Sequence, residues 1–79
     1  MHSIQTAYYD LANAIVFQAV TDYRKALNGV SYNKKYPPEI IVTKLEKFFR
    51  SSWYRTLTKV DGEYLIERIR EETLGKEQK

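Results

Sequence analysis

The residues best suited to chemistry in this chain of 79 amino acids are basic and aromatic side chains gathered between positions 44 and 55. They are Lys44, Lys47, Arg50, Trp53, Tyr54 and Arg55. Such cations neutralise phosphates or acidic protein surfaces, and such rings stack on unpaired bases or fill pockets of a protein partner. We therefore interpret these six residues as a candidate partner-binding surface. The alternative is a solvated basic face beside aromatic core residues, and the sequence leaves both interpretations open.

Positive charge is concentrated in the same part of the chain. The whole sequence carries a formal charge of +3. Residues 34–60 hold seven basic and two acidic side chains, a net charge of +5, whereas residues 61–79 hold four basic and six acidic side chains, a net charge of −2. The basic excess attracts either nucleic acid or an acidic protein surface, and it does not choose between them.

Residue types that support catalysis or metal binding are sparse. The chain has no cysteine, and its single histidine, His2, lies at the terminus without neighbouring ligands. Asp61 and Glu63 flank Gly62, but helix capping accounts for the first carboxylate and the glycine lacks the context of a phosphate-binding loop. We therefore expect no enzymatic activity, no cofactor and no metal site.

Helical segments must position the candidate residues. Apolar residues recur at helical spacing from Ile4 to Leu27 over about half of the helical wheel, and Asn28-Gly29 predicts the end of this helix. So broad an apolar face predicts a helix central to the fold, or one that also contacts a second subunit. Phe17 falls on the polar side of the wheel, so we count it as a partner-binding residue; the alternative is that a kink or the later helices cover it.

A second helix is predicted over residues 38–50, with Pro38 in its first turn. Its polar side carries Lys44, Lys47 and Arg50, and its core side carries Ile41, Leu45, Phe48 and Phe49. Ser51 and Ser52 predict a break with a short helical turn that carries Trp53 and Tyr54.

A third helix is predicted over residues 59–73, with Leu65, Ile66 and Ile69 inward. Thr58 is its expected N-cap, with Asp61 in place of the usual capping-box acid, and Gly75 is expected to end it.

These segments predict a single all-α domain over residues 1–79, a compact bundle of three main helices with a short helical turn between the second and the third. Residues 75–79 are expected to fray. A chain of this size buries only roughly 60–65% of its unfolded surface, so we expect a homo-oligomer. No apolar run approaches the 20 or so residues that cross a bilayer, and the first residues lack the basic region of a secretory signal. We expect a cytoplasmic protein without membrane contact.

Residues 46–54 (EKFFRSSWY), followed by Leu57-Thr58 and by residues 61–66 (DGEYLI), resemble small uncharacterised proteins encoded by prophages and mobile elements of low-GC Gram-positive bacteria. Residues 12–15 and 22–27 look similar to the first half of the same group. The resemblance implies a phage-type accessory role, in which a small protein occupies a host or phage protein, including defence proteins. It supplies no active-site residues.

We therefore expect a non-enzymatic phage or mobile-element accessory protein that binds, and can inhibit, a host or phage protein. The alternative is a nucleic-acid-binding module that uses the basic and aromatic surface of residues 44–59. A helix-turn-helix version of this alternative is disfavoured, because the acidic side chains of the last helix would face the DNA.

Overall fold

The fold is taken from a computed structural model, which describes residues 4–30 and 35–75. Every element in these two ranges is a helix, so the all-α prediction is confirmed. In chain order the helices are α1 (Ile4–Leu27), α2 (Pro38–Phe49), α3 (Ser52–Leu57) and α4 (Gly62–Leu74). Within the described ranges no helix is both long enough and apolar enough to cross a membrane. His2 and residues 76–79 of the predicted frayed tail lie outside the described residues.

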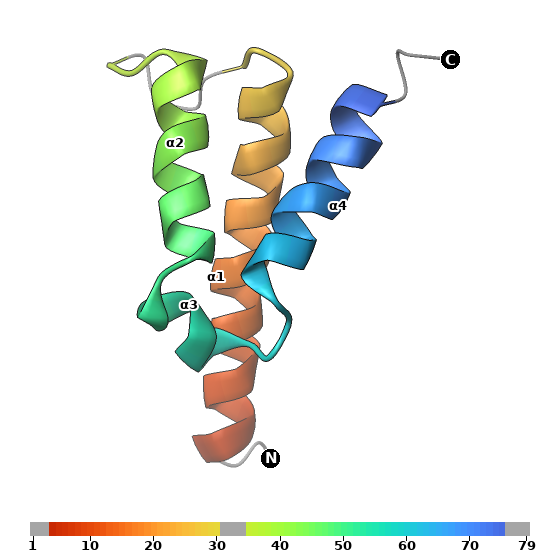
Figure 1. The fold of residues 1–79 in the computed structure, drawn as a ribbon. Helices are drawn as coiled ribbons and strands as arrows, with labels where there is room; N and C mark the ends of the chain where they lie inside the picture. Colours follow the sequence, from red (N-terminus) through yellow and green to blue (C-terminus); the bar gives the residue numbers. More distant parts are fainter. Residues whose placement is uncertain (1–3, 31–34, 76–79) are drawn as a thin grey trace.

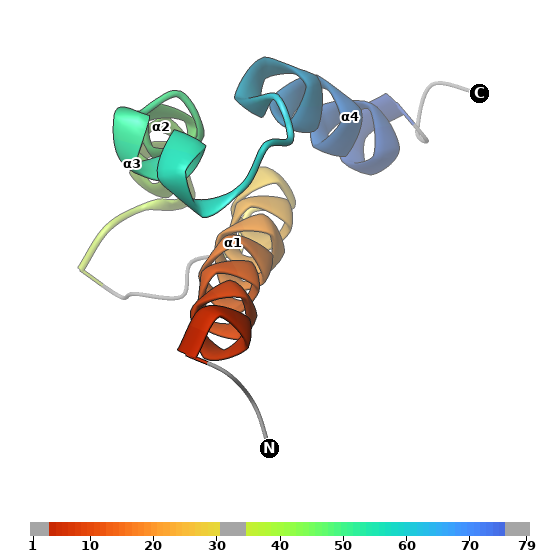
Figure 2. The same ribbon diagram turned by 90° about the horizontal axis from the view of Figure 1, so that it is seen from below.

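The longest helix, α1, packs against all three of the others. Viewed from below, α2 and α3 lie over one flank of α1 and α4 lies over the other flank (Figure 2). From the side, α2 runs next to α1, whereas α4 leans away from α1 toward the C-terminus (Figure 1). The arrangement is an open version of the expected bundle, and the later helices leave one side of α1 uncovered.

The broad apolar face of α1 is explained by contact with three helices. Its buried residues are Ala12, Ala19, Tyr23 and Ala26. Three of these are alanines, whose small side chains let neighbouring helices approach closely. Leu11 belongs to the apolar spacing that predicted this helix, but the covering helices reach Ala12 and leave 62% of Leu11 exposed.

The end of α1 and the start of α2 follow the sequence prediction. Gly29 adopts a φ of 82°, and its N–H donates to the carbonyl of Ala26 at 3.0 Å. Glycine reaches this left-handed conformation without strain, which is why it terminates the helix. Pro38 occupies the first turn of α2, where its missing N–H costs no hydrogen bond.

The inward side of α2 differs in detail from the prediction. Ile41 and Phe49 are buried at 1% exposure each, whereas Leu45 and Phe48 are only half-buried. The wheel places all four residues on one side, but α1 and α4 together enclose only part of that side. Phe49 is therefore the central aromatic residue of α2.

The break between α2 and α3 lies at Ser51, as predicted, but the start of α4 was predicted wrongly. Thr58 is extended, and its hydroxyl accepts a hydrogen bond from Val60 N–H. Asp61 is the N-cap, and its carboxylate accepts from Tyr64 N–H at 3.3 Å. The helix therefore begins at Gly62, because the intervening residues form the connection that turns the chain from α3 to α4.

Aromatic rings from three helices form the centre of the core. Tyr23 of α1 meets Phe49 of α2 edge to face, with ring centroids 5.4 Å apart. Phe49 meets Tyr54 of α3 in the same manner at 5.7 Å. Edge-to-face pairs at these distances are favourable beyond the area that they bury. Ile66 and Ile69 complete the core from α4, as predicted.

Candidate functional site

Ser51 fixes the position of α3, which carries two of the candidate residues. Its hydroxyl accepts a hydrogen bond from Tyr54 N–H at 3.1 Å and donates one to the Phe48 carbonyl at 2.6 Å. One side chain thus satisfies backbone groups at the end of α2 and at the start of α3. Tyr54 and Leu57 are buried on the inner side of α3, so this short helix is held at both ends.

Trp53 lies on the outer side of α3. Its side chain is 55% exposed, whereas the next residue, Tyr54, is 1% exposed. Consecutive residues of a helix point about 100° apart, so burial of Tyr54 turns the indole of Trp53 toward solvent. The structure therefore presents a large aromatic side chain on a fixed backbone.

Tyr54 was predicted as a partner-binding residue, and its burial corrects that prediction. Its ring packs edge to face against Phe48 and Phe49, with centroids 5.7 Å apart in both pairs. Its hydroxyl is buried without a hydrogen-bond partner among the described residues. Burial raises the pKa of this phenol, and the negative charge of Asp61 adds to the effect. Tyr54 is a core residue.

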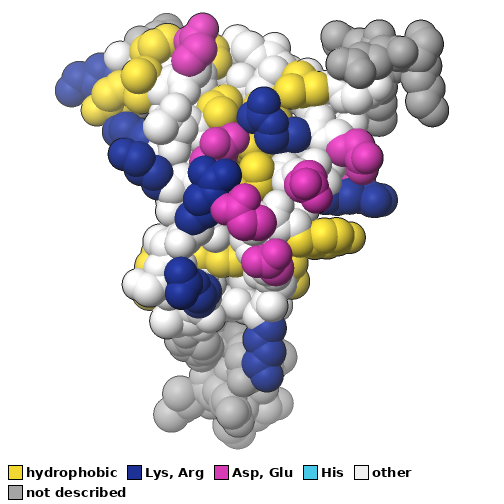
Figure 3. Space-filling model, in the orientation of Figure 1, with side chains coloured by type: hydrophobic (Ala, Val, Ile, Leu, Met, Phe, Trp, Pro, Cys, Tyr) yellow, Lys and Arg dark blue, Asp and Glu magenta, His cyan; other side chains and the backbone are white. Residues whose placement is uncertain are grey.

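Arg50 was predicted as a cation available to a partner, but it is engaged within the protein. Its guanidinium donates to both carboxylate oxygens of Glu63 and lies 3.8 Å from the carboxylate of Glu46. The hydrogen bond from Arg50 lowers the pKa of Glu63, and the same bond raises the pKa of Arg50. In Figure 3 acidic and basic side chains are interleaved across the face formed by α2 and α4. The acidic helix α4 thus offsets part of the basic excess of residues 34–60.

The other predicted cations are exposed. Lys44 lies over the ring of Tyr36, with its Nζ 4.1 Å from the ring centroid. Lys47 has no acidic partner among the described residues. Arg55 donates to the carbonyl of Arg50 at 3.5 Å, which orients it across the end of α2.

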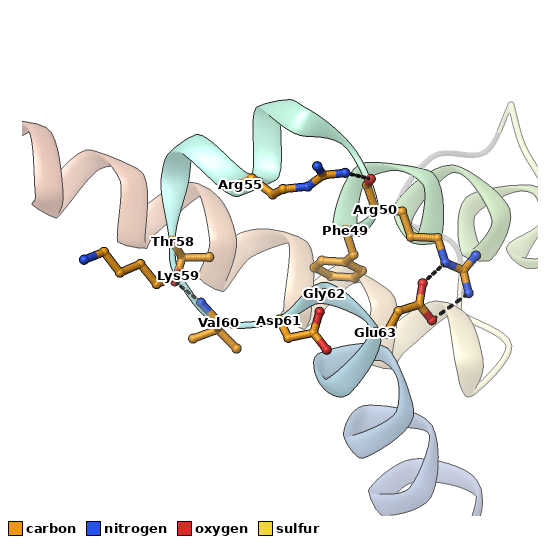
Figure 4. A pocket seen from close by; sticks show the side chains of 9 residues that line it. All are labelled: Phe49, Arg50, Arg55, Thr58, Lys59, Val60, Asp61, Gly62 and Glu63. Carbon is orange, nitrogen blue, oxygen red and sulfur yellow. Dashed lines mark hydrogen bonds and ion pairs between the residues drawn. The ribbon is translucent and has the colours of Figure 1, made fainter.

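A hollow of about 520 Å³ lies where the end of α2, the end of α3 and the start of α4 meet. Its walls are formed by Phe49, Arg50, Arg55, Thr58, Lys59, Val60, Asp61, Gly62 and Glu63 (Figure 4). The walls carry three cations, Arg50, Arg55 and Lys59, and two carboxylates, Asp61 and Glu63, of which Glu63 accepts from Arg50. The hollow therefore offers both signs of charge, which suits polar protein groups better than a uniformly negative phosphate chain.

The candidate residues do not form one surface. Only Arg50 and Arg55 line the hollow, and Lys44 and Lys47 lie earlier on α2. Phe17 comes from α1 and is 72% exposed, as predicted. It is the most exposed of the large apolar side chains that the structure describes.

Sequence reasoning missed a polar network that joins α1, α2 and α4. The hydroxyl of the fully buried Tyr23 donates to Glu46 at 2.6 Å, and Arg70 donates to the same carboxylate oxygen at 3.1 Å. Burial and the Glu46 carboxylate raise the pKa of Tyr23 to about 12, so its hydroxyl stays protonated near neutral pH. The available signal was Glu46, an acidic residue between Lys44 and Lys47, but its partners lie 23 and 24 residues away in the sequence.

Within the described ranges, histidine, cysteine and carboxylate side chains nowhere form a group of three that could hold a metal ion. Comparison with protein-family models, with curated proteins and with solved structures found no match.

Proposed function

We propose that this chain is a non-enzymatic accessory protein of phage or mobile-element type, and that it binds a host or phage protein through Trp53 and the adjacent exposed residues of α3. The observation that carries the proposal is the pair Trp53 and Tyr54, of which the first is 55% exposed and the second 1%. A tryptophan held by a buried neighbour loses little conformational freedom on binding. Such residues dominate the binding energy of many protein interfaces.

The charges in the hollow next to α3 also favour a protein partner. Arg55 and Lys59 line the neighbouring hollow together with Asp61. A protein surface can match such a mixture, whereas a polyanion would be repelled by the carboxylate. Val60 adds an apolar side chain that is 47% exposed.

The experiment is affinity purification of the tagged chain from a low-GC Gram-positive host, with and without nuclease, followed by binding measurements with the purified partner. We expect a nuclease-resistant protein whose Kd rises about 30-fold, or roughly 2 kcal/mol, in Trp53→Ala. The matched control is Tyr64→Ala, which removes an aromatic ring of 57% exposure from α4. Equal retention of the partner by both variants, with helicity unchanged, would contradict the proposal.

The second candidate is nucleic-acid binding, which is favoured by the exposed lysines that lack an acidic partner among the described residues. They are Lys44, Lys47 and Lys59. Replacing all three with glutamine should then weaken binding to unrelated sequences equally and flatten the salt dependence of log affinity by about 0.7 to 0.9 for each lost phosphate contact. A protein-binding chain instead keeps most of its affinity in this triple variant. Arg50 is excluded from the test because its loss would also break the contact with Glu63.

A further inference from the structure

The outward side of α1 carries one large apolar side chain, Phe17, among small and polar residues, and none of the described helices covers it. Figure 2 shows α2, α3 and α4 together on the opposite side of this helix. Phe17 on this side is 72% exposed. A monomer gains nothing from exposing a phenylalanine ring to this extent, whereas a second helix that covers the ring would bury its apolar area.

Five residues define what we call the α1 outer face: Asp10, Ala14, Phe17, Thr21 and Lys25. At 100° per residue they fall within one 80° sector of the wheel, opposite the buried residues Ala19 and Tyr23. Ala14 and Thr21 are the small side chains near the middle of this sector.

Charge is distributed unevenly along the α1 outer face. Asp10 lies toward its N-terminal end and Lys25 toward its C-terminal end, and neither has an ion-pair partner among the described residues. Arg24, by contrast, is paired with Glu72 at 3.0 Å. The α1 outer face is therefore negative at one end and positive at the other, with the Phe17 ring between the small residues Ala14 and Thr21.

We propose that the α1 outer face binds the same face of a second copy of this chain, with the two helices antiparallel about a two-fold axis beside Phe17. A parallel pair would bring Asp10 against Asp10 and Lys25 against Lys25, which is repulsive. An antiparallel pair places each Asp10 opposite Lys25 of the second copy, and two-fold symmetry makes this contact twice.

A single alignment of the two helices both pairs Asp10 with Lys25 of the second copy and brings the two Phe17 rings together. The point midway between Asp10 and Lys25 lies between positions 17 and 18, so a two-fold axis there brings the two Phe17 rings side by side. The same axis sets Ala14 at the height of Thr21 of the second copy. Small side chains at that contact allow the short interaxial distance, about 8 Å, at which helices pack closely.

Cysteine trapping tests the alignment, because the natural chain contains no cysteine. Ala14→Cys mixed with Thr21→Cys should give a disulfide-linked dimer under mild oxidation, since the two positions lie at the same height only in the antiparallel pair. Each variant alone should stay largely uncross-linked, because its own two copies lie about 10 Å apart along the helix axis. Cross-linking of Ala14→Cys with itself would indicate a parallel pair and overturn the proposal.

Charge reversal supplies an independent test in sedimentation velocity from about 5 to 500 µM, a range suited to the modest interface of a single helix pair. Asp10→Lys or Lys25→Asp alone should weaken dimerisation about tenfold, and the double variant should restore it to within about twofold. Failure of the double variant to restore the dimer would contradict the pairing of these two residues.

Phe17→Glu should abolish the dimer while circular dichroism shows unchanged helicity. Tyr64→Glu, which makes the same kind of replacement at a 57% exposed ring of α4, is the matched control and should dimerise like the wild type. A wild-type chain that remains monomeric at 500 µM, or a dimer that Phe17→Glu leaves intact, would overturn the proposal. Because Trp53 and Phe17 are tested separately, failure of the dimer leaves the proposed partner binding unaffected.

Discussion

The start of α4 touches the end of α2 through the backbones of Gly62 and Phe49. A Cβ atom at position 62 would lie 2.0 Å from the carbonyl oxygen of Phe49 and 2.9 Å from its carbonyl carbon. Neither atom belongs to a flexible side chain, so a larger residue would have to move one helix away from the other. The glycine between the two acidic residues is thus required by helix packing.

Gly62→Ala should lower the free energy of unfolding by about 1–3 kcal/mol, because the added methyl group overlaps the Phe49 backbone. Gly75→Ala is the control, since Gly75 has a φ of −68° and a Cβ there would lie an ordinary 3.8 Å from the Glu71 Cγ. That variant should be neutral or up to about 1 kcal/mol more stable. Urea unfolding followed by circular dichroism measures both, and equal stability of the two variants would contradict the close approach.

Tyr23→Phe should destabilise the protein by about 1–3 kcal/mol, because it removes the hydrogen bond to the Glu46 carboxylate while keeping the buried ring. The loss should be smaller when Glu46 is already glutamine. A double-mutant cycle with Glu46→Gln in urea unfolding measures this coupling. Additive effects of the two substitutions would show that the pair does not interact.

The same tyrosine predicts a loss of stability at alkaline pH. The pKa of Tyr23 rises from 10.0 to about 12 in the folded protein. The stability that the protonated Tyr23 hydroxyl contributes is therefore complete below pH 10 and is lost as the pH rises to about 12. The unfolding free energy of the wild type should therefore fall toward that of Tyr23→Phe over this window. A difference between the two proteins that stays constant from pH 9 to pH 12 would contradict the shift.

Tyr54→Phe should leave stability unchanged or raise it, in contrast to Tyr23→Phe. The Tyr54 hydroxyl is buried without a hydrogen-bond partner among the described residues, so its removal relieves a desolvation cost. Thermal melting of the two variants side by side gives the comparison. A melting temperature of Tyr54→Phe as low as that of Tyr23→Phe would show that the hydroxyl does form a stabilising bond.

Glu63→Gln should remove part of the acid sensitivity of the protein. The hydrogen bond from Arg50 lowers the pKa of Glu63 below 4.5. The stability that this bond gives the folded protein is therefore present above pH 4.5 and is lost as the pH falls through the lowered pKa of Glu63. The wild type should lose stability more steeply than the variant below pH 4.5, and added salt should reduce the difference because both groups are exposed. Glu67→Gln, at an exposed position of α4 without an ion pair among the described residues, should behave like the wild type.

Phe49→Ala should cost about 3–5 kcal/mol, enough to threaten the folding of so small a domain. Phe49 is 1% exposed and touches the rings of Tyr23 and Tyr54, whereas Phe48 is only half-buried. Phe48→Ala should therefore cost less. Chemical unfolding measures the free energy of unfolding of both variants. A larger loss of stability for Phe48→Ala than for Phe49→Ala would mean that the centre of the core lies elsewhere.

The sequence by itself determined where most of the helices begin and end. Gly29 ends α1, Pro38 opens α2 and Ser51 separates α2 from α3, as their residue types predict. These signals are local, because a cap, a proline or a left-handed glycine acts on backbone groups within one turn. Apolar spacing likewise predicted the buried Ile66 and Ile69.

Only the tertiary structure decided which neighbouring side chain points inward and which charges are already paired. From the sequence alone, Trp53 and Tyr54 are equally plausible surface residues. The structure distinguishes them because Phe48 and Phe49 pack against the ring of Tyr54. Arg50 counts as a free cation until α4 brings Glu63 to it. Burial and ion pairing depend on residues that lie far apart in the chain and meet only when the helices pack, so the pattern within one helix cannot specify them.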